Sequence, residues 1–461
     1  MTDTICALAT APGGALGIIR ISGPQSLEIL SRVFRGSGNA LTYPANTIHY
    51  GHLVPLLQEG SGEVTPHDIL DEVMVSVFRA PHSYTGEDSV EISCHGSRYI
   101  LNKALELLIA CGCRMANPGE YTMRAYLNGK MDLSQAEAVA DLIASTNKAT
   151  HQMAMSQLRG GISTELGHLR EQLLKLTSLL ELELDFSDHE DLEFADRSEL
   201  LDLTKKIDNH ITRLTHSFEA GQAIKKGIPV AIVGKTNVGK STLLNQLVGD
   251  DRAIVSDIHG TTRDTIEETM EINGIQFRFI DTAGIRQTQD EVEKIGIDRT
   301  LHKIKEARIV IWLLDQRPSW SEIDEMSELS KGKRSIYVHN KVDLIDIQKF
   351  NPYILPLSMI SAKKGEGIDH LKMRIYEEAQ LAGLTTNAND VIVSNARHYD
   401  ALTRAHEHLE RVLDGLNNGL SGDLLSEDLH LILDTLAEIT GGQITPNEVL
   451  GNIFKNFCVG K

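Results

Sequence analysis

The chain is poor in cysteine and has no long apolar run. Its 461 residues include only five cysteines, at positions 6, 94, 111, 113 and 458. Their odd number and scattered positions exclude a disulfide framework, and the spacing of Cys111-Gly-Cys113 is too short for a typical metal-binding pair. No apolar run reaches the roughly 18 residues of a membrane helix, and the N-terminus lacks the pattern of a signal peptide. We therefore expect a cytoplasmic protein in a reducing compartment, with no membrane partner.

Positive charge is also scarce in this sequence. The chain has 45 lysines and arginines against 64 acidic residues, which gives a net charge of −19. A nucleic-acid partner therefore cannot be inferred from the bulk charge and would require a local basic patch. Hydrophobic residues make up 41% of the chain, which is enough to form ordinary cores. The length allows about three domains.

One stretch in the middle of the chain fits the pattern of a phosphate-binding loop, G-x-x-x-x-G-K-[ST]. It is Gly234-Lys-Thr-Asn-Val-Gly-Lys-Ser241. The apolar run 228–233 predicts a buried strand before it, and residues 242–247 predict the start of a helix after it. Lys240 can reach the β- and γ-phosphates of a nucleotide, and the Ser241 hydroxyl can hold Mg²⁺. The alternative is a chance match in a glycine-rich loop, which the flanking strand and helix disfavour.

Further motifs, all in the expected order, favour GTP over ATP. Asp281-Thr-Ala-Gly284 can contact Mg²⁺ through water and sense a γ-phosphate. Asn340-Lys-Val-Asp343 provides a carboxylate that accepts two hydrogen bonds from guanine, which adenine does not offer. The backbone of Ser361-Ala-Lys363 can donate to guanine O6, and Gly260-Thr-Thr-Arg-Asp264 lies where a switch loop belongs. Within that switch loop, Thr262 is the candidate second ligand of Mg²⁺.

These motifs together define the predicted GTP-binding residues. They comprise the phosphate loop, the first switch segment, the Asp281 motif and the two loops that recognise the base. The set that these motifs give is Asn237, Val238, Gly239, Lys240, Ser241, Thr242, Gly260, Thr261, Thr262, Asp281, Thr282, Ala283, Gly284, Asn340, Lys341, Asp343, Ser361, Ala362 and Lys363.

The group that orients the attacking water is not given by these motifs alone. Ras-like GTPases place a Gln directly after Asp-Thr-Ala-Gly, but this chain has Ile285 there. Glu291 and Glu293 are both candidates for the role, and each could instead be a solvated switch residue. The side-chain oxygen of Asn237 can coordinate a monovalent cation beside the phosphates, where an arginine finger would otherwise neutralise charge. A loop Asn chosen for turn geometry is the alternative.

Hydrophobic periodicity indicates several domains. Residues 1–120 combine short strands with one helix at 98–110 and predict an α+β domain. Residues 121–222 and 383–461 carry helical apolar stripes and predict the two parts of one helical bundle domain. Residues 223–382 alternate strand and helix patterns, which predicts a mostly parallel sheet wrapped by helices. The expected architecture is thus an α+β N-terminal domain and a helical bundle with an inserted Ras-like P-loop GTPase domain.

Local patterns add detail to the helical parts. Ser134-Gln-Ala-Glu137 is a capping-box signature and predicts a helix start, with Ile143 on the apolar face that follows. Leu173, Leu176, Leu180 and Leu184 recur at helical spacing and predict a bundle core. The acidic segment 185–196 is expected to be a solvated connection, with metal binding as the alternative.

Glycines mark two further features of the middle of the chain. Asn273-Gly274 lies between two β-like runs and predicts a hairpin. Gly221 and Gly227 are expected to flank the exit from the helical region into the central strand.

These residues carry a family resemblance that covers essentially the whole chain. It rests on Gly17-Ile-Ile-Arg-Ile-Ser-Gly23, Tyr84-Thr-Gly-Glu-Asp88, Pro118-Gly-Glu-Tyr-Thr-Met-Arg-Ala-Tyr-Leu-Asn-Gly-Lys130, the inserted GTPase domain and the terminal Phe457-Cys-Val-Gly-Lys461. The chain resembles the bacterial and organellar tRNA-modification GTPases of the MnmE family, also called TrmE. One departure is Thr236, where the family usually has Pro, and we expect a softer loop rather than lost function. Val459 replaces a common Ile, which is conservative.

The resemblance implies specific ligands. The N-terminal domain would bind 5-formyl- or 5,10-methylene-tetrahydrofolate and form a homodimer, with folate contacts at Arg20, Glu91, Lys130 and Lys461. In the GTPase domain, the GTP-binding residues would also include Ser256, Asp257, Ile258 and His259. K⁺ would be held by Asn237, Ser256, Ile258 and Thr261, and Mg²⁺ by Ser241 and Thr262. Glu293 would be the catalytic residue that orients the water. Cys458 matches a family cysteine whose chemical role stays open.

The resemblance also implies a reaction and partners. The family acts with an FAD-dependent protein, MnmG, in a heterotetramer-type complex. Together they attach an aminomethyl or carboxymethylaminomethyl group, whose carbon comes from the folate, to C5 of the wobble uridine of certain tRNAs. GTP and K⁺ would bring the two GTPase domains of a dimer together. The alternatives are an RNA- or ribosome-assembly GTPase, although no RNA-binding signature such as a KH-type loop is present, and a dimerising mechanical GTPase.

Overall fold

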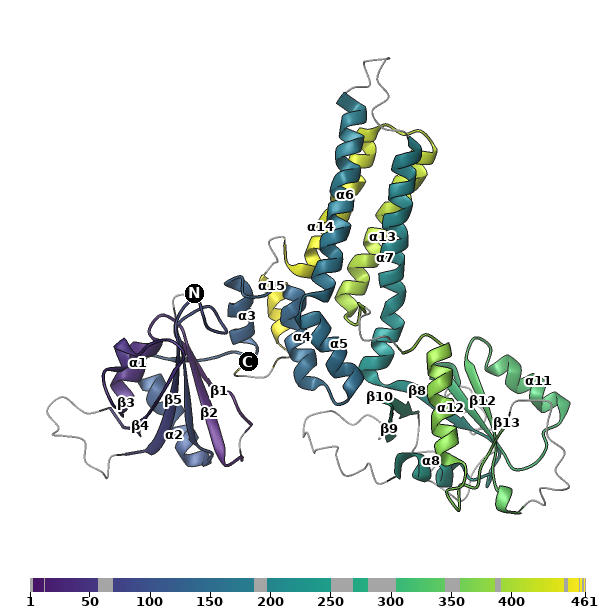
Figure 1. Cartoon of the computed structure of the whole chain (residues 1–461), viewed down its shortest axis with the longest axis horizontal. Helices are drawn as coiled ribbons and strands as arrows, with labels where there is room; N and C mark the ends of the chain where they lie inside the picture. Colours follow the sequence, from purple (N-terminus) through teal and green to yellow (C-terminus); the bar gives the residue numbers. More distant parts are fainter. Residues whose placement is uncertain are drawn as a thin grey trace. The chain divides into compact units, whose positions relative to one another are not determined.

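The structure is a computed structural model that describes residues 3–11, 13–56, 69–185, 197–249, 268–280, 304–344, 357–385, 391–442, 447–455, 457 and 460. Contacts within the chain divide it into two compact units (Figure 1). The first contains residues 1–143, 158–163 and 437–461, and the second contains residues 144–157 and 164–436. The domain boundaries expected near residues 120, 222 and 382 remain a prediction. None of the described helices is both long enough and apolar enough to span a membrane.

The first unit is built on a seven-stranded sheet with the order β3-β4-β5-β6-β2-β1-β7. All paired neighbours are antiparallel except β1 and β7, which are parallel. The strands are β1 (Ile5–Leu8), β2 (Leu16–Ser22), β3 (Phe34–Gly36), β4 (Thr47–Leu53), β5 (Asp71–Phe78), β6 (Ser89–His95) and β7 (Arg114–Met115). This arrangement, with the helices described next, confirms the predicted α+β fold.

Two helices pack against this sheet, α1 (Ser26–Val33) and α2 (Arg98–Ala110), and a short 3₁₀ turn η1 spans Ala40–Thr42. The pattern of β5 explains why: every second residue is buried, and Val73, Val75 and Val77 belong to the core shared with these helices. Alternation with period two places one row of side chains on each face of a sheet, so the apolar row requires a cover.

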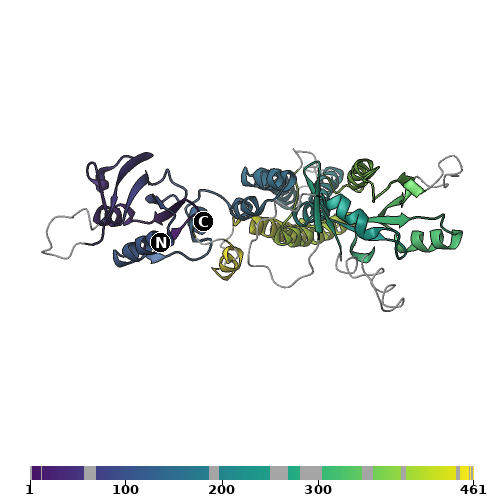
Figure 2. The same cartoon turned by 90° about the horizontal axis from the view of Figure 1, so that it is seen from below.

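Three more helices belong to the first unit, wholly or nearly so: α3 (Glu120–Leu127), α4 (Leu133–Ala144) and α15 (Asn447–Phe454). Helix α15, near the C-terminal end of the sequence, therefore packs against α4 of the same unit. Leu450 and Phe454 of α15 share a buried cluster with Leu133 and Ala136 of α4. Both ends of the chain lie close to this part of the unit in Figures 1 and 2.

The predicted capping box of α4 is wrong by two residues. Asp132 is the cap, because its Oδ1 accepts from Gln135 N at 2.9 Å while Gln135 Oε1 accepts from Asp132 N at 2.9 Å. Ser134 is buried inside the helix, where its hydroxyl donates to Asp132 Oδ1. Asp caps a helix as well as Ser does, so the local pattern alone does not identify the first residue. Ile143, expected on the buried face, is exposed.

The second unit contains most of a helical bundle, formed by α5 (Lys148–Leu158), α6 (Gly161–Asp185), α7 (Arg197–Lys226), α13 (Ala396–Asn417) and α14 (Gly422–Thr440). Leu173, Leu176 and Leu180 of α6 are fully buried, which confirms the predicted core. The side chain of Leu184 and the acidic segment from 186 onward lie outside the described residues. Helices α7 and α13, far apart in sequence, lie side by side (Figure 1).

Gly221 does not flank the exit from the helical region as expected, because α7 continues to Lys226. A Cβ at Gly221 would lie 2.2 Å from the backbone oxygen of Val393, so the missing side chain lets the returning chain pass close to the helix. Gly227, with φ of +83°, follows the last helical residue and leads into the sheet, as predicted.

The rest of the second unit is a six-stranded sheet with the order β13-β12-β11-β8-β10-β9. Its strands are β8 (Ile228–Val233), β9 (Glu268–Ile272), β10 (Ile275–Phe279), β11 (Ile309–Leu314), β12 (Arg334–His339) and β13 (Leu357–Met359). Every paired neighbour is parallel except the hairpin of β9 and β10, whose turn Asn273-Gly274 has positive φ at both residues. Both the parallel sheet and the hairpin were predicted.

Helices enclose this sheet on both faces. Leu243 and Leu247 of α8 (Lys240–Val248) and Leu371 of α12 (Ile368–Leu381) share one core cluster with the strands. Ile323 and Met326 of α11 (Trp320–Leu329) pack against a second cluster that includes Trp312. A short 3₁₀ turn, η4 (Val342–Leu344), follows β12. The phosphate loop lies between β8 and α8, at the carboxyl ends of the parallel strands, where ligands bind in sheets of this kind.

Candidate functional site

The phosphate loop has the backbone that anion binding requires. Gly239, with φ of +102°, is the N-cap of α8, and a Cβ there would lie 2.4 Å from Asn340 Nδ2. Asn237 also has a positive φ, of 58°, which Asn tolerates better than most residues. Because the first N–H groups of α8 have no partner within the helix, the loop and helix start can receive phosphate oxygens.

The side-chain amide of Asn340 joins this loop to the base-recognition segment. Its Nδ2 donates to Val238 O at 2.8 Å, and its Oδ1 accepts from Ala362 N at 2.9 Å. Asn340 is buried and follows directly after β12. One amide therefore ties its own loop to the phosphate loop, 102 residues earlier in the sequence, and to the loop of Ala362, 22 residues later. The motif predicted that Asn340 and Ala362 lie at one site, and the structure brings them together.

Asp343, the predicted reader of guanine, is held in place by Ser361. Ser361 Oγ donates to Asp343 Oδ1 at 2.7 Å, and Ser361 itself is fully buried. This hydrogen bond, supported by the charges of Lys364 and Lys363, keeps the pKa of Asp343 below its usual value. An ionised carboxylate has only acceptors, as pairing with guanine N1–H and the 2-amino group requires.

The two lysines of the loops are also engaged. Lys240 Nζ donates to the backbone oxygens of Gly234 and Lys235, at 2.8 and 2.7 Å. Lys341 Nζ lies 2.7 Å from Asp315 Oδ2, at the end of the neighbouring strand β11. The side chain of Lys240 thus bends back over the loop whose motif predicts binding of the β- and γ-phosphates. Lys240 is the first residue of α8, and Ser241, the candidate Mg²⁺ ligand, and Thr242 follow it in the helix.

Several predicted residues lie outside the described part of the chain. They include the first switch segment with Thr262, the Asp281 motif, the catalytic candidate Glu293 and its alternative Glu291, and the terminal Cys458 and Lys461. Of the expected K⁺ ligands, Ser256, Ile258 and Thr261 are also outside it, and Asn237 alone is described. Within the described residues, no group of three or more His, Cys, Asp and Glu side chains forms a metal site. The roles assigned to all these residues stay predictions.

A second candidate site lies in the first unit, on β2 and β6. Arg20 and Glu91 are direct cross-strand partners, and Arg20 Nη2 lies 2.7 Å from Glu91 Oε1. The guanidinium also lies over the rings of Tyr84 and Tyr121, at 5.6 and 5.5 Å from their centroids. Arg20 Nη1 donates to the backbone oxygen of Gly460 at 3.3 Å, so the chain's last residues reach this site. The structure thus brings together two of the four predicted folate contacts.

Lys130, the third of these contacts, is attached to the loop that carries Tyr84. Its Nζ donates to Pro81 O at 2.9 Å, and Tyr84 Oη is 2.8 Å from Thr122 Oγ1 of α3. Tyr121 donates its hydroxyl to the backbone oxygen of Arg20 at 2.8 Å. Sequence reasoning did not single out Tyr84 or Tyr121, although each lies within a motif that carries the resemblance. Tyr121 is fully buried and supports Arg20 from below, whereas Tyr84 is exposed, so Tyr84 and the Arg20 guanidinium present a surface suited to a flat aromatic ligand.

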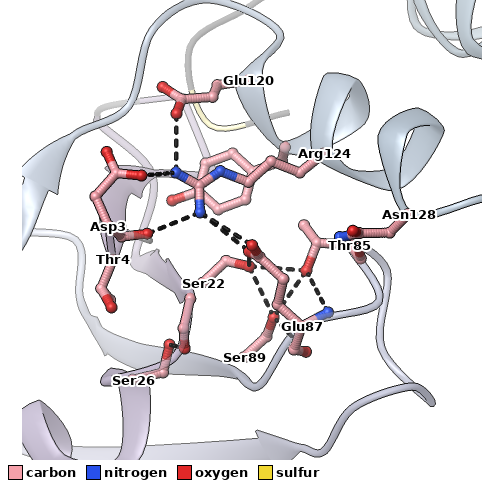
Figure 3. A network of polar contacts seen from close by, with 12 residues as sticks. Asp3, Thr4, Ser22, Ser26, Thr85, Glu87, Ser89, Glu120, Arg124 and Asn128 are labelled. Carbon is pink, nitrogen blue, oxygen red and sulfur yellow. Dashed lines mark hydrogen bonds and ion pairs between the residues drawn. The ribbon is translucent and has the colours of Figure 1, made fainter. Parts of the chain in front are cut away.

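A buried network around Arg124 holds the elements of this second site (Figure 3). The guanidinium is 1% exposed and donates to Asp3, to Glu87 at 3.1 and 3.2 Å, and to Glu120 at 3.0 Å. Burial raises the pKa of Glu120, but hydrogen bonds and charge from Arg114 and Arg124 outweigh it and lower the pKa. Ser22 of β2 donates to Glu87, so one arginine connects the N-terminus, β2, the 81–88 loop and α3. Nothing in the sequence motifs indicated this role.

A parallel sheet with a glycine-rich phosphate loop, an Asn340–Asp343 base-recognition loop and a Ser361–Lys363 loop defines the class of P-loop GTPases. Comparison with known families is more specific. Residues 133–458 match the family described as MnmE helical domain, and residues 4–130 match GTP-binding protein TrmE N-terminus. The chain belongs to the MnmE (TrmE) family of tRNA-modification GTPases.

Individual relatives agree with this assignment over their full length. The tRNA modification GTPase MnmE of Phocaeicola vulgatus is 52% identical over 496 residues, covering 100% of this chain and 99% of the relative. The protein of the same name from Bacteroides thetaiotaomicron is 52% identical over 476 residues, with the same coverage. Among solved structures, the G domain of the T. maritima FeoB iron transporter covers 33% of this chain at 25% identity with a TM-score of 0.25, which adds nothing to the assignment.

Proposed function

We propose that this chain is a K⁺-dependent GTPase that works with the FAD-dependent protein MnmG to modify C5 of the wobble uridine in certain tRNAs. The added group is aminomethyl or carboxymethylaminomethyl, and its carbon comes from 5-formyl- or 5,10-methylene-tetrahydrofolate. The observation that carries the proposal is that the whole chain is 52% identical in sequence to relatives named tRNA modification GTPase MnmE. The active form is a homodimer in a heterotetramer-type complex with the partner.

In the GTPase domain, GTP would lie between the phosphate loop and the Asp343–Ser361 pair. The donor set fits this nucleotide, because Gly239 leaves room for Asn340 to join the phosphate loop to the base-recognition loop and the hydrogen bond from Ser361 favours the ionised form of Asp343. Ser241 would hold Mg²⁺ together with Thr262, which neutralises phosphate charge. Asn237 would be one ligand of K⁺, with Ser256, Ile258 and Thr261, and Glu293 would orient the attacking water.

In the N-terminal unit, the folate would bind at Arg20, Glu91, Lys130 and Lys461. The supporting observation is that the Arg20 guanidinium lies over the rings of Tyr84 and Tyr121, with the backbone of Gly460 within hydrogen-bond distance. The pterin ring is flat and polar at its edge, so stacking and a carboxylate partner suit it.

Two measurements on the purified chain test the proposal. GTP hydrolysis should fall strongly when K⁺ is replaced by Na⁺, and Glu293→Ala should slow hydrolysis while GTP affinity stays near normal. Equal rates in both salts, or an unchanged rate for the variant, would contradict the assigned roles. Addition of 5-formyl-tetrahydrofolate should raise the melting temperature, because a ligand that binds only the native state stabilises it.

One experiment separates this function from an RNA- or ribosome-assembly GTPase. Transfer RNA from cells that lack the gene should have unmodified wobble uridines, while ribosomal subunit profiles should stay normal. The reverse result, normal wobble uridines with defective subunits, favours the alternative.

A further inference from the structure

A cavity of about 760 Å³ lies in the second unit where α7 ends and β8 begins. It is lined by side chains of α7, of the starts of β8 and β11, of β10 and of α13, among them Phe218, Lys226, Arg278, Arg308 and Tyr399. Its position is at the amino end of β8, whereas the phosphate loop follows the carboxyl end of the same strand. The cavity is therefore separate from the nucleotide site, and both can be occupied at the same time.

The charge of this lining differs from that of the whole chain. Lys226, Arg278 and Arg308 come from three different elements, against one carboxylate, Glu219, which lies 3.1 Å from Arg308. Both groups of that ion pair are about half exposed or more, so it is weak in water. In a chain with a net charge of −19, this is the local basic patch that a nucleic-acid partner requires.

A further cation is crowded against this patch. Lys333 Nζ donates to Lys305 O and Ala307 O, directly before Arg308, at 2.6 and 2.7 Å. Burial lowers the pKa of Lys333, and the charge of Arg308 lowers it further. Like charges held together repel each other, so an anion bound between them would be favourable.

Two stacked rings form the other part of the lining. Phe218 of α7 and Tyr399 of α13 have centroids 4.3 Å apart and an interplanar angle of 23°. Tyr399 is 37% exposed, so the stack keeps accessible aromatic surface. A simple phosphate ion would not need the rings, and an apolar ligand would not need the cations. A nucleotide in a single-stranded segment has both a charged phosphate and a flat base.

We propose that this cavity holds one nucleotide of an RNA strand, with its phosphate beside Lys226 and Arg308 and its base against Tyr399. This inference rests on the proposed function, because it takes the tRNA to be the RNA. The volume is within the range of small-molecule sites, about 300–1,000 Å³, so one nucleotide fits. The bound nucleotide would contact the bundle helices α7 and α13 and the first residues of the sheet together.

Binding of a fluorescently labelled tRNA to the full-length chain tests this inference. Lys226→Gln should weaken binding at least threefold and reduce the slope of log affinity against log salt by about 1, as expected for one lost phosphate contact. Tyr399→Leu should weaken binding about fivefold or more, because a stacked base contributes roughly 1–3 kcal/mol. The matched control is Lys225→Gln, since Lys225 is an exposed neighbour on the same helix that does not line the cavity.

The outcomes distinguish the cavity from the proposed function. If Lys226→Gln, Tyr399→Leu and Lys225→Gln all bind tRNA as the wild type does, the cavity is not the RNA site, while the proposed function stands. If the wild type itself does not bind the labelled tRNA, alone or with its partner protein, both ideas fail together. An equal loss in Lys226→Gln and Lys225→Gln with no effect of Tyr399→Leu also overturns the inference, because bulk charge alone would explain it.

Discussion

The hydroxyl of Ser361 donates to Asp343 at 2.7 Å, across two loops that follow different strands of the same sheet. This bond restrains one oxygen of the Asp343 carboxylate. It also leaves the second oxygen available for a base. Specificity for guanine therefore depends on two residues, one that contacts the base and one that positions the contact.

The first prediction concerns the base itself. Asp343→Asn replaces one acceptor oxygen by an NH₂ donor, which opposes the 2-amino group of guanine and suits the 2-oxo group of xanthine. We expect GTP affinity to fall by about two orders of magnitude or more. The new NH₂ group would face the guanine 2-amino group, and two donors that face each other in a desolvated site lose their hydrogen bonds. Xanthosine triphosphate should bind better than GTP to the variant.

The control for this change is Asp369→Asn, which removes an exposed carboxylate from the first turn of α12. It should leave the affinity for both nucleotides unchanged. Equilibrium titration with fluorescent analogues of the two nucleotides measures all four combinations. Equal preference for GTP in wild type and Asp343→Asn would remove Asp343 from base recognition.

The second prediction is a pH dependence. The hydrogen bond from Ser361 is the largest cause of the lowered pKa of Asp343, so Ser361→Ala should raise that pKa toward its ordinary value. Only the ionised carboxylate accepts both guanine donors, so GTP affinity falls as the pH falls through the pKa of Asp343. In the variant this loss should begin at higher pH than in the wild type. GTP titrations of the wild type and the variant, from neutral pH into the acid range, measure this difference. If GTP affinity falls over the same pH range in both proteins, the prediction is wrong.

The third prediction concerns Arg124. Arg124→Met leaves Glu120, which is 2% exposed, with less compensation for its charge, and breaking such a buried pair costs about 3–5 kcal/mol. The matched control is Arg32→Met, whose partner Glu28 is half exposed on the same helix, and its cost should stay below about 1 kcal/mol. Both tryptophans, Trp312 and Trp320, are in the second unit, so their fluorescence does not report on the first.

This location of the tryptophans sharpens the measurement. In urea, the transition of Arg124→Met followed by circular dichroism should shift to lower concentration, while the transition followed by tryptophan fluorescence stays in place. A shift of equal size in both signals would mean that the network stabilises the whole chain rather than the first unit. The folate affinity of the variant should also fall, since Arg124 holds the loop of Glu87 and Tyr84.

The elements that the sequence predicted well are those set by local chemistry. The hairpin at Asn273-Gly274 follows from two residues that tolerate positive φ, and the strand at 228–233 follows from a short β-branched run before a phosphate loop. The placement of Asn340 beside Ala362 was accessible because the motif order fixes which loops meet. These predictions need no knowledge of distant contacts beyond the fold class.

The features that sequence reasoning missed depend on residues far apart. Arg124 contacts Glu87 and Asp3 only after the sheet and α3 have packed, and no local pattern encodes that. The start of α4 was misplaced because Asp132 and Ser134 are both good caps, and packing against Ser163 decides between them. Glycine often ends a helix, so the sequence predicts a helix end near Gly221. In the structure, this glycine instead leaves room for the backbone oxygen of Val393 beside α7.

The last prediction uses two helical glycines of the second unit that differ only in their surroundings. Gly167 of α6 has no atom within 4 Å of a would-be Cβ, whereas at Gly221 of α7 that Cβ would lie 2.2 Å from Val393 O. Gly→Ala in an exposed helix normally stabilises by about 0.5–1 kcal/mol, so Gly167→Ala should raise the free energy of unfolding. Gly221→Ala should lower it by about 1–3 kcal/mol, because α7 and the segment that precedes α13 must move apart.

Tryptophan fluorescence in urea reads both variants, because both glycines and both tryptophans belong to the second unit. Opposite signs for the same substitution isolate the contact with Val393 from helix propensity, which is common to the two sites. If Gly221→Ala were neutral or stabilising, the close contact between the 391–395 backbone and α7 would not contribute to stability. The segment that leads from the sheet domain to α13 would then not be fixed against the bundle at this point. GTP turnover of Gly221→Ala then tests whether the contact between 391–395 and α7 is needed for catalysis, with Gly167→Ala as the reference.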